Sequence, residues 1–293
     1  MKVKVIKINA FSDSIYGGNP SGVVINSPVL TDGQMKYISK TMQVSETGFI
    51  FPSKKADYKV RFFSPKVEVN LCGHATIATF FALALTGAVS GGNNISLTQE
   101  TKVGVLPVNI CFNDYGEIDR VMMTQVKPRL KNIYLDISKL ADSLNISSDV
   151  INDSYPKQIV STGLFTLPLC IDSFDTLSDI EPDFEKIKKI CKKLNVGSFH
   201  LFTFDTIDSK SIYHARNFAP LYGVNEDPVT GTANGAVCSY LLKNNIIEEC
   251  NLICEQGDII KRPGRVFVEI GKTDVKVGGM ARFVEEREIY QIL

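Results

Sequence analysis

The sequence carries no excess of charge of either sign. Its 293 residues include 32 Lys plus Arg and 32 Asp plus Glu, so the formal net charge is zero. Proteins that bind nucleic acid gather phosphates with a surplus of basic side chains, and that surplus is lacking here. We therefore expect no nucleic acid partner.

The sequence also lacks an apolar run long enough to cross a membrane. The most apolar stretch, residues 75–89, is shorter than the roughly 20 residues of a membrane span and contains Thr and Gly. The first ten residues alternate Lys with Val and Ile and show no apolar signal core. These features predict a cytoplasmic protein with no membrane partner.

Cysteine and histidine are too scattered to indicate a metal site. The seven cysteines include no Cys-x-x-Cys pair, and there are only three histidines. We expect buried free thiols and no metal. His200 and His214 fall in strand patterns, so we expect them to be structural or to lie at a dimer contact.

What the chain does contain is an internal repeat. Residues 60–65 (VRFFSP) match residues 215–220 (ARNFAP), with Arg, Phe and Pro identical. A glycine turn follows each match, CGHA at 72–75 and TGTA at 230–233. An internal repeat in a chain about twice the usual domain length predicts two similar domains.

The predicted domains are residues 1–127 and residues 128–279, joined by a basic, proline-containing linker at 127–131. Residues 280–293 are expected to return to the first domain, with the return beginning by residue 282. Each half is expected to follow the same order of helix, strands, glycine turn and long helix. The ranges are 31–42, 48–51, 58–63 and 75–85 in the first half, and 183–194, 198–205, 211–218 and 233–242 in the second.

The helices expected at 75–85 and 233–242 contain no charged residue. A helix that is apolar on nearly every face must be covered by protein on all sides. The many short strands are therefore expected to curve around each helix. The predicted fold class is α+β, with two pseudo-symmetric domains, each a curved, nearly closed mixed β-sheet around a central buried helix.

Each glycine turn places reactive side chains where a helix begins. The unsatisfied N–H groups of a helix N-terminus favour a carboxylate or a developing enolate. Cys72 and His74 lie at the first turn, and Asp227, Thr230 and Thr232 lie at or near the second. Each residue also has a structural interpretation: His74 as a helix cap, Cys72 as a small buried hydrophobe, and Asp227 as the start of a turn.

Glu46 lies where the first helix gives way to an apolar strand, so its carboxylate can point inward. A solvated surface glutamate or a helix cap is the simpler interpretation of an isolated carboxylate, and position alone does not exclude it.

Taken together, these motifs resemble the phenazine-biosynthesis PhzF-like family. The ordered set is Gly18-Asn19-Pro20, Ser45-Glu46-Thr47, Ser161-Thr162-Gly163, Gln256-Gly257, Gly278-Gly279, and the segments at 72–76 and 226–233. The family is similar to diaminopimelate epimerase in fold, with the active site between two domains. The resemblance implies an isomerase that acts without a cofactor and forms a homodimer.

The resemblance also implies roles for individual residues. Glu46 would be the general acid/base, with His74 and Asp227 as its catalytic neighbours. Substrate would be bound at the two turns by Cys72, Gly73, Thr230, Gly231 and Thr232.

The second turn departs from the pattern of two-thiol racemases, which carry a cysteine at each turn. Here Thr230 occupies the second position, and a hydroxyl cannot replace a thiol as a base near neutral pH. We therefore favour a proton shift by Glu46 alone on a small carboxylate-bearing metabolite, with burial raising the pKa of Glu46. The alternatives are a non-catalytic small-molecule-binding or regulatory protein and a Cys72-dependent racemase or epimerase.

Overall fold

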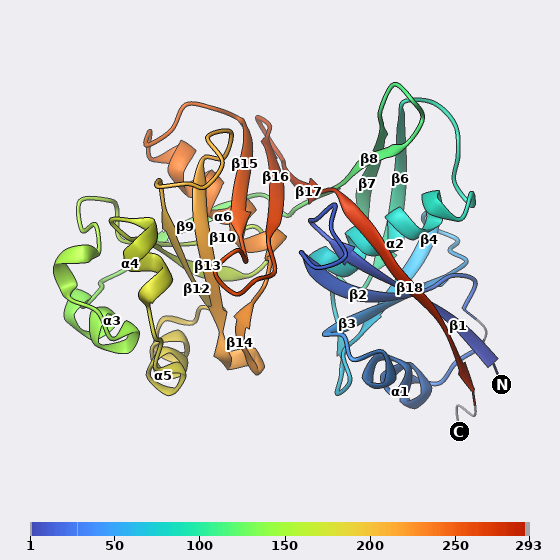
Figure 1. Cartoon of the computed structure of the whole chain (residues 1–293), viewed down its shortest axis with the longest axis horizontal. Coiled ribbons are helices and arrows are strands. Elements are labelled where there is room, and N and C mark those ends of the chain that lie inside the picture. The colour runs from blue at the N-terminus through green and yellow to red at the C-terminus, as the bar shows by residue number, and fades with distance from the viewer. Residues whose placement is uncertain (1, 28, 291–293) are drawn as a thin grey trace. The chain divides into compact units, whose positions relative to one another are not determined.

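The computed structural model describes residues 2–27 and 29–290 and divides the chain into two compact units (Figure 1). The first unit comprises Met1–Thr124 and Gly278–Leu293, and the second comprises Gln125–Val277. The last three residues of the predicted C-terminal return lie outside the described residues. In the described part of the chain, no helix is long and apolar enough to cross a membrane.

The first unit is a mixed sheet around a central helix. Its elements are β1 (Lys2–Ala10), β2 (Asn19–Val24), α1 (Asp32–Met42), β3 (Glu46–Phe51), β4 (Tyr58–Phe63), β5 (Glu68–Val69), α2 (Gly73–Leu85), β6 (Asn94–Thr101), β7 (Gly104–Phe112), β8 (Ile118–Thr124) and β18 (Ala281–Tyr290). The strand order is β18-β1-β2-β3-β4-β6-β7-β8, with β5 also on β4. Helix α2 contacts β1, β2, β3, β7, β8 and β18, which is why the body of this uncharged helix is buried.

The second unit repeats this plan around helix α6. Its elements are β9 (Arg129–Asn132), α3 (Ile137–Leu144), the 3₁₀ turn η1 (Ser148–Val150), β10 (Gln158–Ser161), β11 (Phe165–Cys170), α4 (Phe174–Asp179), α5 (Phe184–Leu194), β12 (Ser198–Thr203), β13 (Tyr213–Ala219), the 3₁₀ turn η2 (Pro220–Tyr222), β14 (Val224–Asp227), α6 (Gly231–Lys243), β15 (Asn251–Gln256) and β16 (Gly264–Ile270); β17 (Val275–Gly279) spans the boundary between the units. The strand order is β9-β10-β11-β12-β13-β15-β16, with β14 also on β13.

The two sheets share one succession of pairings. The parallel pairs β2/β3 and β4/β6 of the first unit correspond to β11/β12 and β13/β15 of the second. The antiparallel pairs between and beside them correspond as well, as β3/β4 does to β12/β13. The central helices are both 13 residues long. The predicted α+β class, with a mixed sheet around a buried helix in each repeat, is confirmed.

In each unit the identical Arg of the sequence repeat forms the same ion pair with a Glu and lies against the identical Phe. Arg61 donates from Nε and Nη2 to the two oxygens of Glu68 at 2.8 and 2.9 Å. Arg216 donates in the same way to Glu226, at 2.9 Å for both bonds. Each guanidinium lies 4.9 Å from the centre of the Phe ring two residues later. The match between the halves therefore preserves a structural contact, which occupies the Glu226 carboxylate.

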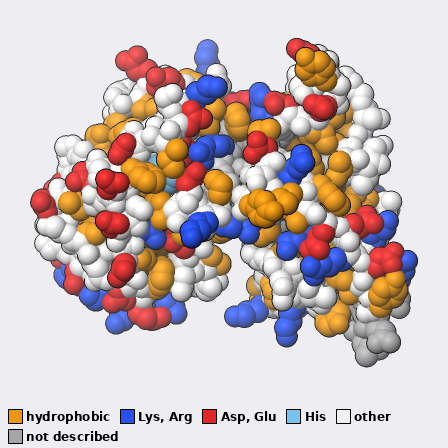
Figure 2. All heavy atoms as spheres, in the orientation of Figure 1, with side chains coloured by type: hydrophobic (Ala, Val, Ile, Leu, Met, Phe, Trp, Pro, Cys, Tyr) orange, Lys and Arg blue, Asp and Glu red, His pale blue; other side chains and the backbone are white. Residues whose placement is uncertain are grey.

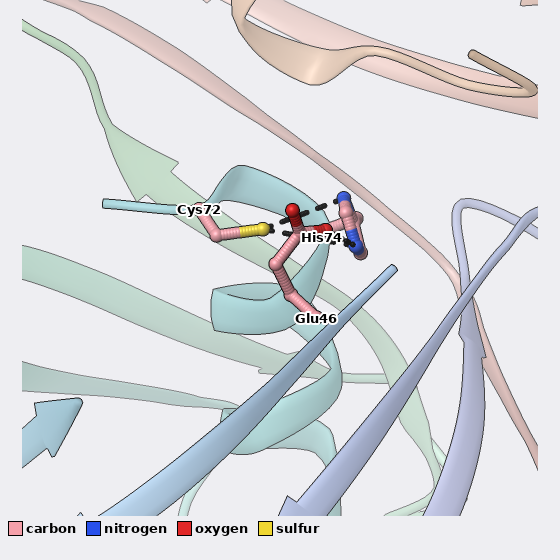
Figure 3. A group of neighbouring side chains, drawn as sticks. All are labelled: Glu46, Cys72 and His74. Atoms are coloured by element: carbon pink, nitrogen blue, oxygen red, sulfur yellow. Dashed lines mark hydrogen bonds and ion pairs between the residues drawn. The ribbon is translucent and has the colours of Figure 1, made fainter. Parts of the chain in front are cut away.

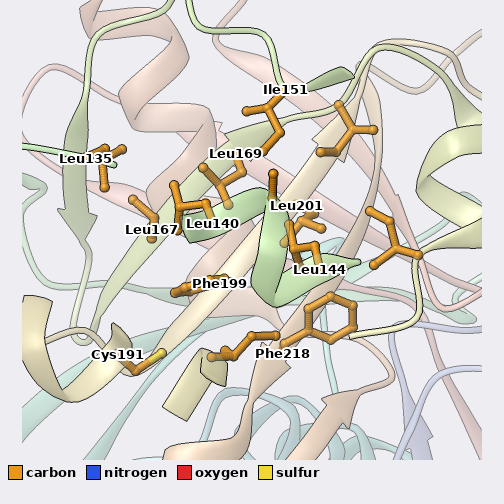
Figure 4. Packing of buried hydrophobic residues seen from close by; sticks show 14 of the residues in the cluster. Leu135, Leu140, Leu144, Ile151, Leu167, Leu169, Cys191, Phe199, Leu201 and Phe218 are labelled. Atoms are coloured by element: carbon orange, nitrogen blue, oxygen red, sulfur yellow. The ribbon is translucent and has the colours of Figure 1, made fainter. Parts of the chain in front are cut away.

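A second layer of helices covers the outer face of each sheet. Helix α1 has the predicted capping box between Thr31 and Gln34, and Met35, Ile38 and Met42 share an apolar cluster with Phe49 of β3 and Phe63 of β4. In the second unit, α3 and α5 cover an apolar cluster that contains Phe199 and Leu201 of β12 (Figure 4). The residues between them along β12 face the other side of the sheet. Every residue of the strand is buried, so both of its faces are covered.

The predicted linker is wrong in part. Residues 129–131 belong to β9, where Leu130 pairs with Val160 of β10. A short strand with charged residues on either side of one apolar residue resembles a solvated connection in sequence, and only its pairing with β10 makes it a strand. On the face drawn in Figure 2, basic and acidic side chains are interspersed, as the net charge of zero leads one to expect.

Close packing of β3 on α2 predicts a cost for any side chain at Gly48. A Cβ atom there would lie 2.3 Å from the Thr79 hydroxyl oxygen. We expect Gly48→Ala to lower the free energy of unfolding by about 1–3 kcal/mol, because the core is already filled. Urea denaturation measures this change. Gly33→Ala is the control, since the nearest neighbour of the added Cβ atom would be 3.9 Å away. A Gly48→Ala variant as stable as wild type would contradict the close packing of β3 on α2.

Candidate functional site

The first candidate site begins where α2 starts. Cys72 is the N-cap residue, with extended backbone angles and no capping hydrogen bond from its side chain. Gly73 and His74 are the first two helical residues, so the N–H groups of the first turn lie beside the Cys72 and His74 side chains. The loop-to-helix junction therefore combines the positive end of a helix with two reactive groups.

Glu46 meets this junction from the neighbouring strand. It is the first residue of β3, and the Ser21 hydroxyl of β2 holds its carbonyl oxygen at 2.9 Å. The carboxylate Oε2 lies 3.2 Å from His74 Nε2, and the Ser45 hydroxyl lies 3.1 Å from the same nitrogen. Figure 3 shows Glu46, Cys72 and His74 converging at the start of the helix. The Glu46 side chain keeps 20% of its surface exposed, so it is reachable from solvent.

The contact with His74 reverses the expected effect of burial on Glu46. Burial opposes ionisation of this carboxyl, but the hydrogen bonds from His74, Ser45 and Cys72, with the charge on His74, lower its pKa. The prediction that the pKa of Glu46 is raised is therefore wrong, because it considered burial and left out the opposing effect of the His74 imidazole.

The protonation states of His74 and Cys72 follow from the same contacts. Burial alone would lower the pKa of His74, yet its interactions with Cys72 and then with Glu46 raise it well above the usual value. Burial raises the pKa of Cys72, which keeps it a thiol near neutral pH. With Cys72 a thiol, Glu46 is the neighbour that carries the negative charge, and its contact with His74 favours a carboxylate paired with an imidazolium.

Glu46, Cys72 and His74 are also the one group within the described residues whose donor atoms could hold a metal ion. Cys72 Sγ is nearly equidistant from the two ring nitrogens of His74, at 3.5 and 3.7 Å. The geometry is that of side chains contacting one another.

The second unit carries the equivalent junction at α6. Thr230 is the N-cap residue, again without a capping bond from its side chain, and Gly231 begins the helix. The Thr230 hydroxyl donates a short hydrogen bond to the carboxylate of Asp227, the last residue of β14. The Thr232 carbonyl accepts a hydrogen bond from the Thr162 hydroxyl at 3.0 Å.

The structure thus brings the predicted site residues together in two groups. Glu46, Cys72, Gly73 and His74 lie together in the first unit, and Asp227, Thr230, Gly231 and Thr232 lie together in the second. Cys72 and Thr230 occupy the same position of the repeat, as do His74 and Thr232. The roles of these residues stay predictions. His200 and His214, expected to be structural or at a dimer contact, are fully buried in β12 and β13.

Sequence reasoning missed three polar residues that hold these groups in place: Ser45, Thr162 and Gln256. Ser45 contacts His74, Thr162 binds the second helix start, and Gln256 binds the Asp227–Thr230 turn. The only available signal was that each belongs to a motif already noted for the family resemblance.

Removing His74 should reveal the effect of burial on Glu46. We expect His74→Gln to raise the pKa of Glu46 above its ordinary 4.5, because the opposing charge is gone while the desolvation remains. Carbon-13 NMR titration of the labelled Glu46 carboxyl measures this change. An unchanged Glu46 titration in the variant would show that His74 does not control the carboxylate.

Comparisons with known proteins agree on one family. The model of the phenazine biosynthesis-like protein family matches residues 8–287. An uncharacterized isomerase of Bacillus subtilis (strain 168), YfhB, is 36% identical over 98% of each chain. A solved phenazine biosynthesis protein of the PhzF family from Bacillus anthracis is 32% identical, covers 99% of this chain and 100% of its own, and superposes with a TM-score of 0.90.

A more distant structure shows the fold alone. A hydroxyproline epimerase from Agrobacterium vitis is 13% identical, covers 98% of this chain and 91% of its own, and superposes with a TM-score of 0.63. With a family model that matches nearly the whole chain and a relative 36% identical along its full length, the chain belongs to the phenazine biosynthesis-like (PhzF) family.

Proposed function

We propose that the protein is an isomerase that shifts a proton between carbon atoms of a small carboxylate-bearing metabolite, with Glu46 as the general acid/base and no cofactor. The observation that carries this proposal is the contact between the Glu46 carboxylate and His74 at the start of α2. Relatives named isomerases, such as the Bacillus subtilis protein, support the reaction class.

The charge state of the pair suits proton abstraction. His74 keeps Glu46 ionised near neutral pH, so the carboxylate is ready to take a proton without first losing one. Once Glu46 has taken the proton, the neighbouring imidazolium favours the carboxylate form of Glu46. This preference promotes delivery of the proton to the second carbon. His74 therefore acts as the charge partner that tunes both halves of the shift.

The helix starts supply the binding groups. The N–H groups around Gly73 attract the substrate carboxylate or the enolate-like charge that develops when the proton leaves. Gly231 and Thr232 offer the same type of group at α6, with the Thr230 hydroxyl fixed by Asp227. The substrate is proposed to bind between the two halves of the chain, and Cys72 contributes to binding rather than to proton transfer.

A two-base racemisation is the second candidate, and the repeat argues against it. The position equivalent to Cys72 is Thr230, whose hydroxyl is far too weak an acid to serve as a second base. Burial also raises the pKa of Cys72, which removes the thiolate such a mechanism needs. One base on one carboxylate is the simpler chemistry for this set of residues.

Glu46→Gln should abolish proton exchange with a substrate. A positioned acid/base contributes about 10²- to 10⁴-fold, so we expect the variant to lose at least 10²-fold in deuterium uptake. The measurement incubates wild type and variant with a pooled metabolite extract in deuterated water and finds mass-shifted compounds by mass spectrometry. The compound that takes up deuterium only with wild type is the substrate.

Glu185→Gln is the matched control, because this glutamate side chain is 78% exposed and lies on α5. It should retain wild-type uptake. Equal uptake by wild type and Glu46→Gln would refute Glu46 as the base, and loss of uptake on alkylation of Cys72 would then favour the cysteine mechanism. Binding of a metabolite by wild type with no uptake at all would favour a binding or regulatory protein.

A further inference from the structure

Each unit buries a glutamine beside the start of its central helix. Gln256 ends β15 in the second unit and is 1% exposed, and Gln99 lies in β6 of the first and is fully buried. The strands β6 and β15 correspond in the repeat, since each pairs parallel with the strand that carries the conserved Arg and Phe. A buried amide must find hydrogen-bond partners, so the contacts of these side chains show what they hold.

Gln256 uses all four of its hydrogen-bonding directions on the Asp227–Thr230 turn and the helix that follows. Its Nε2 donates to the Asp227 carbonyl at 2.8 Å and to the Thr230 hydroxyl at 3.2 Å. Its Oε1 accepts from the Thr230 backbone N–H at 3.0 Å and from Asn234 Nδ2 at 2.8 Å. Both hydrogens on Nε2 therefore meet acceptors, and both lone pairs on Oε1 meet donors. A flipped amide would lose these bonds, so the orientation of the Gln256 side chain is fixed.

This fixed amide also sets the direction of the next hydrogen bond. The Thr230 hydroxyl accepts a hydrogen bond from Gln256 Nε2, and its own hydrogen points to the Asp227 carboxylate. The order is Gln256 to Thr230 to Asp227, each donating to the next. Gln256 thereby places both the hydroxyl and the carboxylate without lying at the turn itself.

Gln99 makes a smaller set of contacts. Within the described residues its amide contacts the Thr76 hydroxyl, with Nε2 at 3.3 Å, and Thr76 donates to the Cys72 carbonyl at 2.8 Å. Thr76 and Asn234 are each the fourth residue of their helix. Gln99 pairs with Tyr58, the counterpart of Tyr213, whereas Gln256 pairs with Ala215, so the two glutamines lie two residues apart in the register of the repeat. Gln99 is thus a buried glutamine beside the other central helix with no bond to a predicted catalytic side chain, and it serves as the comparison for losing a buried amide.

We propose that Gln256 is a positioning residue of the isomerase site, which fixes the Thr230 hydroxyl and the Asp227 carboxylate through one amide. This inference rests on the proposed function for its effect on turnover. The effect of Gln256 on the Asp227–Thr230 turn does not depend on the proposed function, because that effect is measurable without substrate.

The test compares Gln256→Met, Gln256→Glu and Gln99→Met. Gln256→Met keeps the volume but removes every hydrogen bond, so the Thr230 amide should exchange with deuterated solvent at least about tenfold faster than in wild type. Gln256→Glu keeps an acceptor for that amide, so the Thr230 amide should stay protected. Gln99→Met should leave the exchange of the Thr230 amide unchanged. NMR hydrogen exchange measures all three.

Turnover separates positioning from packing. Displacing a catalytic group slightly costs about 10²-fold, so we expect both Gln256 variants to lose kcat by about that factor, with a smaller change in KM. Gln99→Met should stay within about threefold of wild type. The kcat of Gln256→Glu should rise toward the wild-type value as the pH falls, because the protonated acid regains a donor for the Thr230 hydroxyl. The kcat of Gln256→Met should show no such rise.

Two results would overturn the proposal. One is an unchanged Thr230 amide exchange rate in Gln256→Met, and the other is a loss of turnover no larger than that of Gln99→Met. Absence of deuterium uptake by wild type would refute the proposed function instead, and the hydrogen-exchange comparison would still decide whether Gln256 holds the turn.

Discussion

The contact between the Glu46 carboxylate and the His74 imidazole is the constraint on which the proposed chemistry depends. It requires β3 to begin beside the first turn of α2, and the absence of a side chain at Gly48 allows that approach. The pair is mostly buried, so each charge is tolerated only because the other is present. Loss of either partner would shift the pKa of the other toward its neutral form.

The same contact sets a pH window for stability. The lowered pKa of Glu46 stabilises the fold above the ordinary value of 4.5, and this contribution is lost as the pH falls through the lowered pKa. The raised pKa of His74 stabilises the fold below the ordinary value of 6.5, and this contribution is lost as the pH rises through the raised pKa. Both contributions are complete between 4.5 and 6.5, and the ion pair itself persists beyond either limit.

Duplication has preserved the scaffold and changed the chemistry. The bidentate Arg–Glu pairs and the central helices recur in both units. The residues at the helix starts do not recur, because His74 corresponds to Thr232 and Cys72 to Thr230. An acid/base pair in one unit and hydroxyl groups in the other favour a reaction in which one side moves the proton and the other holds the substrate.

Much of this was predictable from local sequence. The capping box at Thr31 and the uncharged central helices have strong local patterns, and the structure has both. The strand at Arg129–Asn132 was not predictable, because its only support is pairing with β10. The sign of the Glu46 pKa shift and the contacts of Gln256 depend on residues distant in sequence, namely His74 and Thr230, whose approach only the fold determines.

The most direct test of the central claim is the protonation state of His74, measured by nitrogen-15 NMR of the imidazole rings at pH 7. With three histidines, the signals are assignable, and His200, whose pKa burial lowers to about 4, gives the spectrum of a neutral ring. The account predicts an imidazolium at His74 in wild type and a neutral ring in Glu46→Gln. A neutral His74 in wild type would contradict it.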